Sequence, residues 1–302
     1  MRAAVAVTLT TVALSAAAIA SAQAPAPPSG NYGGGAVLAP PNTLAAPGNM
    51  QISFRVTGTR LRLNAGMGVR CGSGYFSDAV TLAADGSFTA SGTITRRFRG
   101  GVRVRSTYEV TGTVSDASAS GTAQLRNRIF TDGRLTRTCA TGSVQWGARR
   151  PAGDIGAPPA PAGAPLYGTT AQRLEGPRRA IVMRVSADAA KLTRALYEVT
   201  VRCSSRRAAE LAYDVRSRNV VAIYDSPRRN LPLATDGTFS DVERFTFRGG
   251  RAVLRSTERF AGRLGAAGAR GTFSISGVVS DRASGRRIGT CRSGEVTWTA
   301  AV

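Results

Sequence analysis

The stretch LAADGSF at residues 82–88 recurs as LATDGTF at residues 233–239, and it determines both the fold class and the organisation of the chain. An Asp-Gly pair between strand-like runs favours the type I′ turn of a tight hairpin, because both central residues of that turn need a positive φ. The same hairpin signal occurs twice, about half the chain apart. The sequence therefore predicts two β repeats in tandem.

Other motifs recur in the same order along both halves of the chain. They are Tyr32-Gly33 with Tyr167-Gly168, Ile52-x-x-Arg55-Val56 with Ile181-x-x-Arg184-Val185, Val69-Arg70-Cys71 with Val201-Arg202-Cys203, Phe98-Arg99-Gly100-Gly101 with Phe247-Arg248-Gly249-Gly250, Arg105-Ser106-Thr107 with Arg255-Ser256-Thr257, Gly121-Thr122 with Gly271-Thr272, and Thr138-Cys139-x-x-Gly142-x-Val144-x-Trp146 with Thr290-Cys291-x-x-Gly294-x-Val296-x-Trp298. Such a series in one order indicates an internal duplication.

Apolar residues alternate with polar ones in both repeats. Ile52, Phe54 and Val56 share one parity, and Ser53 and Arg55 share the other. This period of two is typical of antiparallel strands with one face in the core and one in water. About seven or eight such runs per repeat fit a small barrel or a small sandwich equally well. We expect an all-β protein of two tandem antiparallel domains.

The chain divides into five parts by composition. They are a signal peptide over residues 1–22, a Pro/Gly/Ala-rich leader over 23–48, repeat 1 over 49–149 with an alternative start near Tyr32, a Pro/Ala/Gly linker over 150–165 with nothing to bury, and repeat 2 over 166–302. Ala20-Ser21-Ala22 fits the small-x-small cleavage pattern, and an uncleaved anchor is the alternative. We expect a secreted or cell-envelope-associated protein with no transmembrane segment after cleavage.

The four cysteines occupy matched places in the two repeats. An even number of cysteines in an exported β protein indicates disulfides. Pairing within each repeat, Cys71 with Cys139 and Cys203 with Cys291, is the simplest of the three possible connectivities. No C-x-x-C pair occurs, which disfavours a zinc ribbon or a thioredoxin-type redox site.

The combination of a Cys, an Asp-Gly hairpin with a following Phe, a Gly-Thr strand and a final Cys-x-x-Gly-x-Val-x-Trp resembles a known arrangement. It is similar to an uncharacterised all-β repeat domain of secreted proteins from high-GC Gram-positive bacteria. The resemblance covers most of each repeat. It implies one disulfide per repeat and no particular activity.

Histidine is absent, which removes several chemistries. No Ser-His or Cys-His dyad can form, and no His-containing metal site can form. The carboxylates shared by both repeats, Asp85 and Asp236, are accounted for by their turns. We expect a non-enzymatic protein with no cofactor and no metal site; a hydrolase with a carboxylate mechanism is the alternative.

The balance of charges is one-sided, with 40 basic and 18 acidic residues and a formal net charge of +22. Codon usage in a GC-rich genome explains the preference for Arg over Lys, but it does not explain the excess over acids. A strongly basic protein is attracted to anionic surfaces. Repeat 2 also has an insertion between Cys203 and Leu233 that contains a helix-like stretch over 206–215. The insertion is either a solvated loop or an anion-binding loop, with the candidate residues Arg206, Arg207, Arg216, Arg218, Arg228 and Arg229.

The function expected from these features is binding of an anionic ligand outside the cytosol. An anionic polymer, lipid head groups or an acidic protein are the candidate partners, and no motif for specific nucleic-acid recognition is present. A purely structural extracellular module is the alternative. Trp146 and Trp298 are expected either in the core or as ligand-stacking residues.

Overall fold

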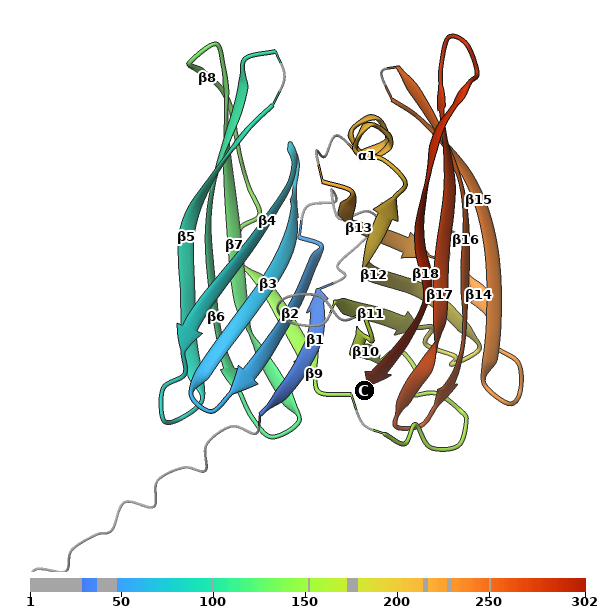
Figure 1. Cartoon of the computed structure of the whole chain (residues 1–302). Coiled ribbons are helices and arrows are strands. Elements are labelled where there is room, and N and C mark those ends of the chain that lie inside the picture. The colour runs from blue at the N-terminus through green and yellow to red at the C-terminus, as the bar shows by residue number, and fades with distance from the viewer. Residues whose placement is uncertain are drawn as a thin grey trace, which may run out of the picture.

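The computed structural model describes residues 29–36, 48–98, 100–151, 153–172, 179–213, 217–226, 230–249 and 251–302. They form two antiparallel sheets of nine strands each, which lie side by side (Figure 1). The all-β, two-domain prediction is confirmed, and each sheet has one or two strands more than the sequence pattern indicated. Among the described residues, no helix is both long and apolar enough to cross a membrane.

Repeat 1 is a meander whose sheet curls almost into a closed barrel. Its strands are β1 (Gly30–Ala36), β2 (Met50–Thr57), β3 (Arg60–Val69), β4 (Gly72–Thr81), β5 (Ser87–Arg97), β6 (Val102–Val114), β7 (Ser118–Thr131), β8 (Arg134–Ala140) and β9 (Val144–Arg149). The strand order is β4-β3-β2-β1-β9-β7-β6-β5, with β8 paired to β7 beside this path. The two edge strands β4 and β5 approach each other and bring the sheet close to closure.

Repeat 2 has the same topology with one helix added. Its elements are β10 (Pro165–Thr170), β11 (Ala180–Val185), β12 (Lys191–Cys203), α1 (Arg206–Tyr213), β13 (Asn219–Ser226), β14 (Leu231–Pro232), β15 (Thr238–Gly249), β16 (Ala252–Gly265), β17 (Gly268–Asp281) and β18 (Arg287–Ala301). The strand order is β13-β12-β11-β10-β18-β17-β16-β15, with β14 paired to β12. The long β18 corresponds to β8 and β9 together.

Because the strands run up and down in turn, successive turns fall at alternate ends of each barrel. The β5–β6, β7–β8, β15–β16 and β17–β18 turns and α1 lie at one end of the molecule, the upper end in Figure 1. We call this the hairpin end. The β2–β3, β4–β5, β6–β7, β11–β12, β14–β15 and β16–β17 turns lie at the opposite end, which we call the turn end.

The interior of each barrel is filled by side chains of alternate residues. Trp146 and Trp298 are 3% and 1% exposed, so both tryptophans are core residues rather than ligand-stacking ones. The ring of Trp146 packs against those of Phe54 and Phe88, at centroid distances of 6.4 and 6.2 Å. In repeat 2 the ring of Trp298 stacks on that of Phe260 at a centroid distance of 5.5 Å, and it also packs against Phe239 at 6.2 Å.

The two repeats also pack on each other, mainly through β1 and β2 of repeat 1 and β10, β11 and β12 of repeat 2. Most residues of β2, β11 and β12 are buried on both faces. The linker likewise contributes to packing, because Ile155 and Ala160 are buried. The expectation that the linker has nothing to bury is therefore wrong. Its backbone oxygens at Ile155 and Ala157 accept hydrogen bonds from the β16–β17 turn.

The two repeats begin close to the positions predicted from the sequence. The leader contains β1, so the first sheet begins within it, near Tyr32. Residues 1–22, with the predicted signal peptide, lie outside the described residues. The Tyr32-Gly33 match is shifted by one residue: Gly34 pairs with Ile52, whereas Gly168 pairs with the equivalent Ile181.

Candidate anion-binding surface

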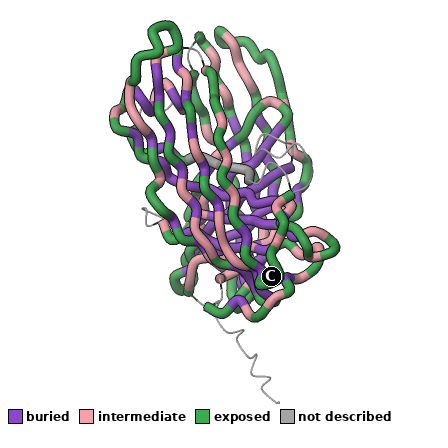
Figure 2. Tube along the Cα trace, turned by 90° about the vertical axis from the view of Figure 1, so that its right-hand side faces the viewer, coloured by how far each residue is buried: buried purple, intermediate pink, exposed green. Residues whose placement is uncertain are grey.

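The four hairpins that reach the hairpin end are rich in arginine. Residues 94–105, 126–138, 244–255 and 278–292 contain at least four arginines each, and their acidic residues are Asp132 and Asp281 alone. The long strands carry these arginines beyond the packed part of the barrels, where they alternate with smaller or apolar residues. The exposed members that we call the arginine rim are Arg96, Arg97, Arg103, Arg105, Arg128, Arg134, Arg137, Arg244, Arg248, Arg251, Arg255, Arg282, Arg286 and Arg287. In Figure 2 the tips of the hairpins are drawn as exposed.

The turn end carries charges of both signs. Its turns contain Asp85, Asp116, Asp188 and Asp236, and exposed arginines such as Arg60 and Arg270 lie near them. The backbone N–H of Ser87 donates to Asp85 Oδ1 at 2.9 Å, and that of Thr238 donates to Asp236 Oδ1 at 3.0 Å. Hydrogen bonding to the side chain and then the backbone of Ser87 lowers the pKa of Asp85, and hydrogen bonding to the backbone and then the side chain of Thr238 lowers that of Asp236. The aspartates are thus charged turn residues, and arginine with few acids nearby is a feature of the hairpin end.

The two acidic residues of the arginine-rich hairpins have structural roles in their turns. Asp281 Oδ1 accepts from the N–H groups of Ala283 and Ser284, at 3.1 and 2.9 Å. Asp132 has a φ of 49°, which the Asp-Gly turn of β7–β8 requires. Its N–H donates to the carbonyl of Gly101 at 3.3 Å, so the two hairpin tips of repeat 1 support each other.

Two arginines of the rim are held against aromatic rings. The guanidinium of Arg103 lies 4.6 Å from the ring centroid of Phe130, and that of Arg96 lies 5.6 Å from the centroid of Tyr75. Arg96 Nη2 also donates to the carbonyl of Tyr75 at 2.9 Å. These contacts orient two guanidinium groups while leaving them exposed.

The candidate residues of the insertion join the hairpin end only in part. Arg206 and Arg207 begin α1 and are exposed, and the positive charge of Arg207 contributes to the lowered pKa of Asp281 on the β17–β18 turn. Arg218 has a structural role, since its Nε donates to the carbonyl of Cys203 at 3.0 Å. Arg216, Arg228 and Arg229 lie outside the described residues.

Helix α1 is packed rather than solvated, which removes the simple loop interpretation of this part of the insertion. Ala208, Ala209 and Ala212 are buried in the core of repeat 2. The short alanine side chains allow the helix to lie close to β18, where the Cβ of Ala208 meets Gly289. The helix therefore covers the barrel at the hairpin end and presents its arginines outward.

Both disulfides lie at the base of the hairpins. Cys71 pairs with Cys139, and Cys203 pairs with Cys291, as the repeat predicts. The first bond joins the β3–β4 turn to β8, and the second joins β12 to β18. The second bond lies where β12 and β18 pair, since Cys203 and Cys291 are register partners. Two such bonds indicate an oxidising environment.

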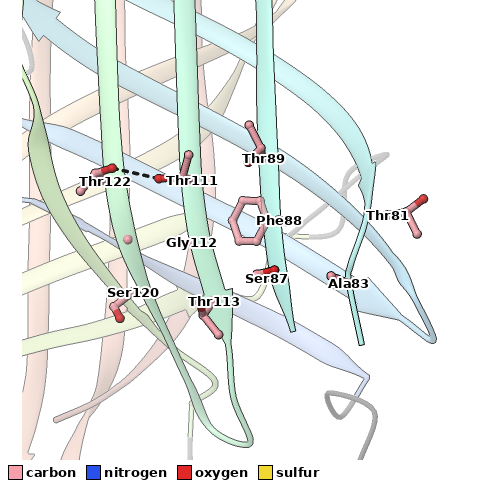
Figure 3. A pocket seen from close by; sticks show the side chains of 11 residues that line it. Thr81, Ala83, Ser87, Phe88, Thr89, Thr111, Gly112, Thr113, Ser120 and Thr122 are labelled. Carbon is pink, nitrogen blue, oxygen red and sulfur yellow. Dashed lines mark hydrogen bonds between the residues drawn. The ribbon is translucent and has the colours of Figure 1, made fainter. Parts of the chain in front are cut away.

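A separate groove lies on the outer face of β5–β7 toward the turn end (Figure 3). Its volume is about 570 Å³. Its lining is hydroxyl-rich and uncharged, with Thr81, Ser87, Thr89, Thr111, Thr113, Ser120 and Thr122. Thr111 and Thr122 share a hydrogen bond of 2.9 Å. The groove offers no cation for an anionic ligand, and repeat 2 has Ala261 at the position of Thr111.

Carboxylates come together inside repeat 2, where Glu243 and Glu258 are register partners on β15 and β16. Glu258 is buried and accepts a hydrogen bond from the Tyr197 hydroxyl. Repeat 1 has a related pair, because the Tyr108 hydroxyl donates to Asp78 Oδ2 at 3.1 Å, and burial with this bond raises the pKa of Tyr108 to about 12. The Tyr197–Glu258 hydrogen bond is buried and the Tyr108–Asp78 hydrogen bond is partly buried, and the groove of Figure 3 reaches neither of them.

Within the described residues, no group of three or more cysteine or acidic side chains is arranged to hold a metal ion. The sequence reasoning concentrated on the insertion and missed the hairpins. The available signal was the duplicated Phe-Arg-Gly-Gly turn with arginines on both sides and few acids nearby.

No protein-family model matches the chain, and searches of curated proteins and of solved structures gave no significant match.

Proposed function

We propose that the protein is an exported, non-enzymatic binding protein whose hairpin end docks on an anionic ligand or surface outside the cytosol. The concentration of arginine at the hairpin end carries this proposal. The arginine rim and the arginines of α1 lie there with few acidic residues among them, whereas the turn end mixes aspartate turns with exposed arginines. A protein with this polarity turns its basic end toward a negative surface, because charge distribution steers and orients association.

The extracytoplasmic location rests on separate support. The two disulfides fit an oxidising compartment. The segment 1–22 has the composition of a signal peptide. The resemblance of each repeat to a domain of secreted proteins from high-GC Gram-positive bacteria points the same way.

The proposal is tested with two variants of equal charge. The hairpin-end variant replaces four exposed arginines by glutamine, at Arg97, Arg137, Arg248 and Arg287. The turn-end variant makes the same change at Arg60, Arg62, Arg184 and Arg270, which are also exposed. Binding to immobilised inorganic polyphosphate is measured at rising salt. We expect the hairpin-end variant to lose about tenfold or more in affinity and the turn-end variant to lose only a few-fold.

The salt dependence gives a second readout. Screening shortens the Debye length from about 10 Å at 0.1 M to about 3 Å at 1 M salt, so wild-type binding should weaken steeply with salt. The hairpin-end variant should show a shallower dependence. Equal losses in the two variants would mean that only total charge matters, and would leave the alternative of a structural module without a specific ligand.

A further inference from the structure

The tips of the hairpins expose large apolar side chains among the arginines. Phe98 is 47% exposed, Leu135 is 55% exposed and Phe247 is 54% exposed. Phe98 lies in the β5–β6 turn, Leu135 lies next to the β7–β8 turn, and Phe247 lies near the end of β15, beside the β15–β16 turn. All three therefore lie at the hairpin end.

Phe98 and Phe247 occupy the same place in the duplicated Phe-Arg-Gly-Gly turn. Gly100 and Gly101 have φ values of 71° and 72°, so this tight turn requires glycine. At Gly249 an added Cβ would lie 2.7 Å from Cε1 of Phe247, so the exposed ring would have to turn aside. The turn chemistry explains the glycines, but the folded barrels do not use the two phenylalanine side chains, which remain half exposed in both repeats.

The combination of cations and exposed apolar side chains selects among anionic partners. A soluble polyanion pairs with the arginine rim but gives no apolar environment to Phe98, Leu135 or Phe247. A lipid bilayer with anionic head groups provides both, a layer of phosphate for the guanidinium groups and an acyl boundary for the apolar side chains. Phenylalanine and leucine are among the side chains that surface-bound segments bury at this depth of a bilayer.

The arrangement of the tips also fits a flat and extended partner. Figure 1 shows the tips of both repeats at one end of the molecule, on either side of α1. The disulfides Cys71–Cys139 and Cys203–Cys291 fix the β7–β8 and β17–β18 hairpins, and the phenylalanine-bearing hairpins pair with these through β6–β7 and β16–β17. One planar surface can thus meet both repeats at the same time.

We propose that the hairpin end docks on the surface of an anionic lipid membrane, with Phe98, Leu135 and Phe247 entering the boundary between head groups and acyl chains. This inference rests on the proposed function and names its partner. It describes peripheral binding, in which the barrels stay outside the bilayer.

The test uses the full chain and vesicles of phosphatidylcholine with and without phosphatidylglycerol. The tip variant replaces Phe98 and Phe247 by serine. Its control replaces two exposed valines away from the tips, Val221 and Val242, by serine. We expect wild-type protein and the control to bind vesicles that contain phosphatidylglycerol, and the tip variant to bind them about tenfold or more weakly. The tip variant should bind polyphosphate like wild type, and circular dichroism should show it folded.

A fluorescent probe reports insertion directly. The native Trp146 and Trp298 are buried, so their emission should change little on binding. Phe247→Trp places an indole at a tip, and its emission should shift to the blue with anionic vesicles but not with polyphosphate. Unchanged vesicle binding of the tip variant, or no blue shift, would overturn the membrane inference. Equal polyphosphate binding by the hairpin-end and turn-end variants would instead overturn the proposed function.

Discussion

At the scale of single residues, a pair of equivalent glycines lies beneath the tryptophans. A Cβ added at Gly112 would lie 2.6 Å from Cζ2 of Trp146, and one at Gly262 would lie 2.7 Å from Cζ2 of Trp298. Each tryptophan ring thus fills space that glycine leaves open on another strand of its sheet. The Val-x-Trp motif therefore depends on a glycine that lies far from it along the chain.

Replacing Gly112 by alanine should therefore destabilise repeat 1. The added methyl group would force the Trp146 ring or the sheet to move, at a cost of about 1–3 kcal/mol in the free energy of unfolding. Urea unfolding followed by circular dichroism measures the change. Gly153→Ala is the control, because nothing lies within 4 Å of a Cβ added there. If the two variants unfold at the same urea concentration, the ring is not packed against Gly112.

Single residues also mark a limit of sequence reasoning. The repeated Tyr-Gly pair predicts equivalent tyrosines, yet Tyr32 lies in the core and stacks on Phe54, whereas Tyr167 is half-buried and its ring lies over Gly147 of repeat 1. A shift of one residue along a strand moves a side chain to the other face of the sheet. A two-residue match without flanking similarity does not fix that register.

At the scale of elements, the aspartate turns connect strand to strand through charged hydrogen bonds. The carboxyls of Asp85, Asp188, Asp236 and Asp281 all have pKa values lowered by backbone and side-chain donors. A carboxyl whose folded pKa lies below its unfolded pKa stabilises the fold above the unfolded value, which is about 4. That contribution is lost as the pH falls through the folded pKa.

We therefore expect the melting temperature to fall as the pH drops below about 4. A double variant, Asp85→Asn with Asp236→Asn, keeps an oxygen acceptor in each turn but removes the titrating charge. Its melting temperature should depend less on pH between 5 and 2 than that of wild type. Thermal melts across this range measure the difference, and parallel curves for the two proteins would contradict the role assigned to the charged turns.

The elements were predicted well where their signals are local. Asp-Gly turns, alternation and the helix-like stretch after Cys203 all appear in the structure, the helix as α1. The packing of α1 could not be predicted from the sequence, because the burial of Ala208 and Ala209 depends on the position of β18, far along the chain. The arginine content of the insertion suggested a binding loop, whereas part of it packs and Arg218 holds the backbone of Cys203.

At the scale of the whole molecule, the two repeats differ where they meet. Repeat 1 presents small residues, and a Cβ at Gly33 would collide with the carbonyl oxygen of Gly168 across the interface. Repeat 2 presents larger buried residues on the facing side, including Val182 and Leu196. The duplicated domains have thus diverged into complementary partners and are not interchangeable.

A buried ion pair lies in the same region. Arg179 Nη1 and Glu198 Oε1 are 3.0 Å apart, and burial raises the pKa of Glu198 although the Arg179 charge opposes this. The pKa of Tyr75 in repeat 1 is raised first by burial and then by the negative charge of Glu198. The charge of Glu198 in repeat 2 thus acts on a tyrosine of repeat 1. No local pattern predicts it, since Tyr75 and Glu198 belong to different domains.

The candidate site also belongs to this largest scale. The net charge follows from the composition, but its distribution over the molecule depends on which turns lie at the same end. In a meander the end at which each turn lies follows from the strand order. The basic end can therefore be predicted from the sequence once the long strands on either side of Phe98 and Phe247 are delimited. The exposure of these two phenylalanines cannot be predicted in this way, because alternation alone would place them in a core.

The most direct measurement of the central claim is a map of the arginines that a polyanion protects. Arginine-specific labelling with phenylglyoxal, read by mass spectrometry, is performed with and without polyphosphate at low salt. Binding through the hairpin end predicts protection of Arg97, Arg137, Arg248 and Arg287, while Arg60, Arg62, Arg184 and Arg270 remain labelled. Equal protection of the two sets, or protection of the turn-end set alone, would contradict a docking surface at the hairpin end.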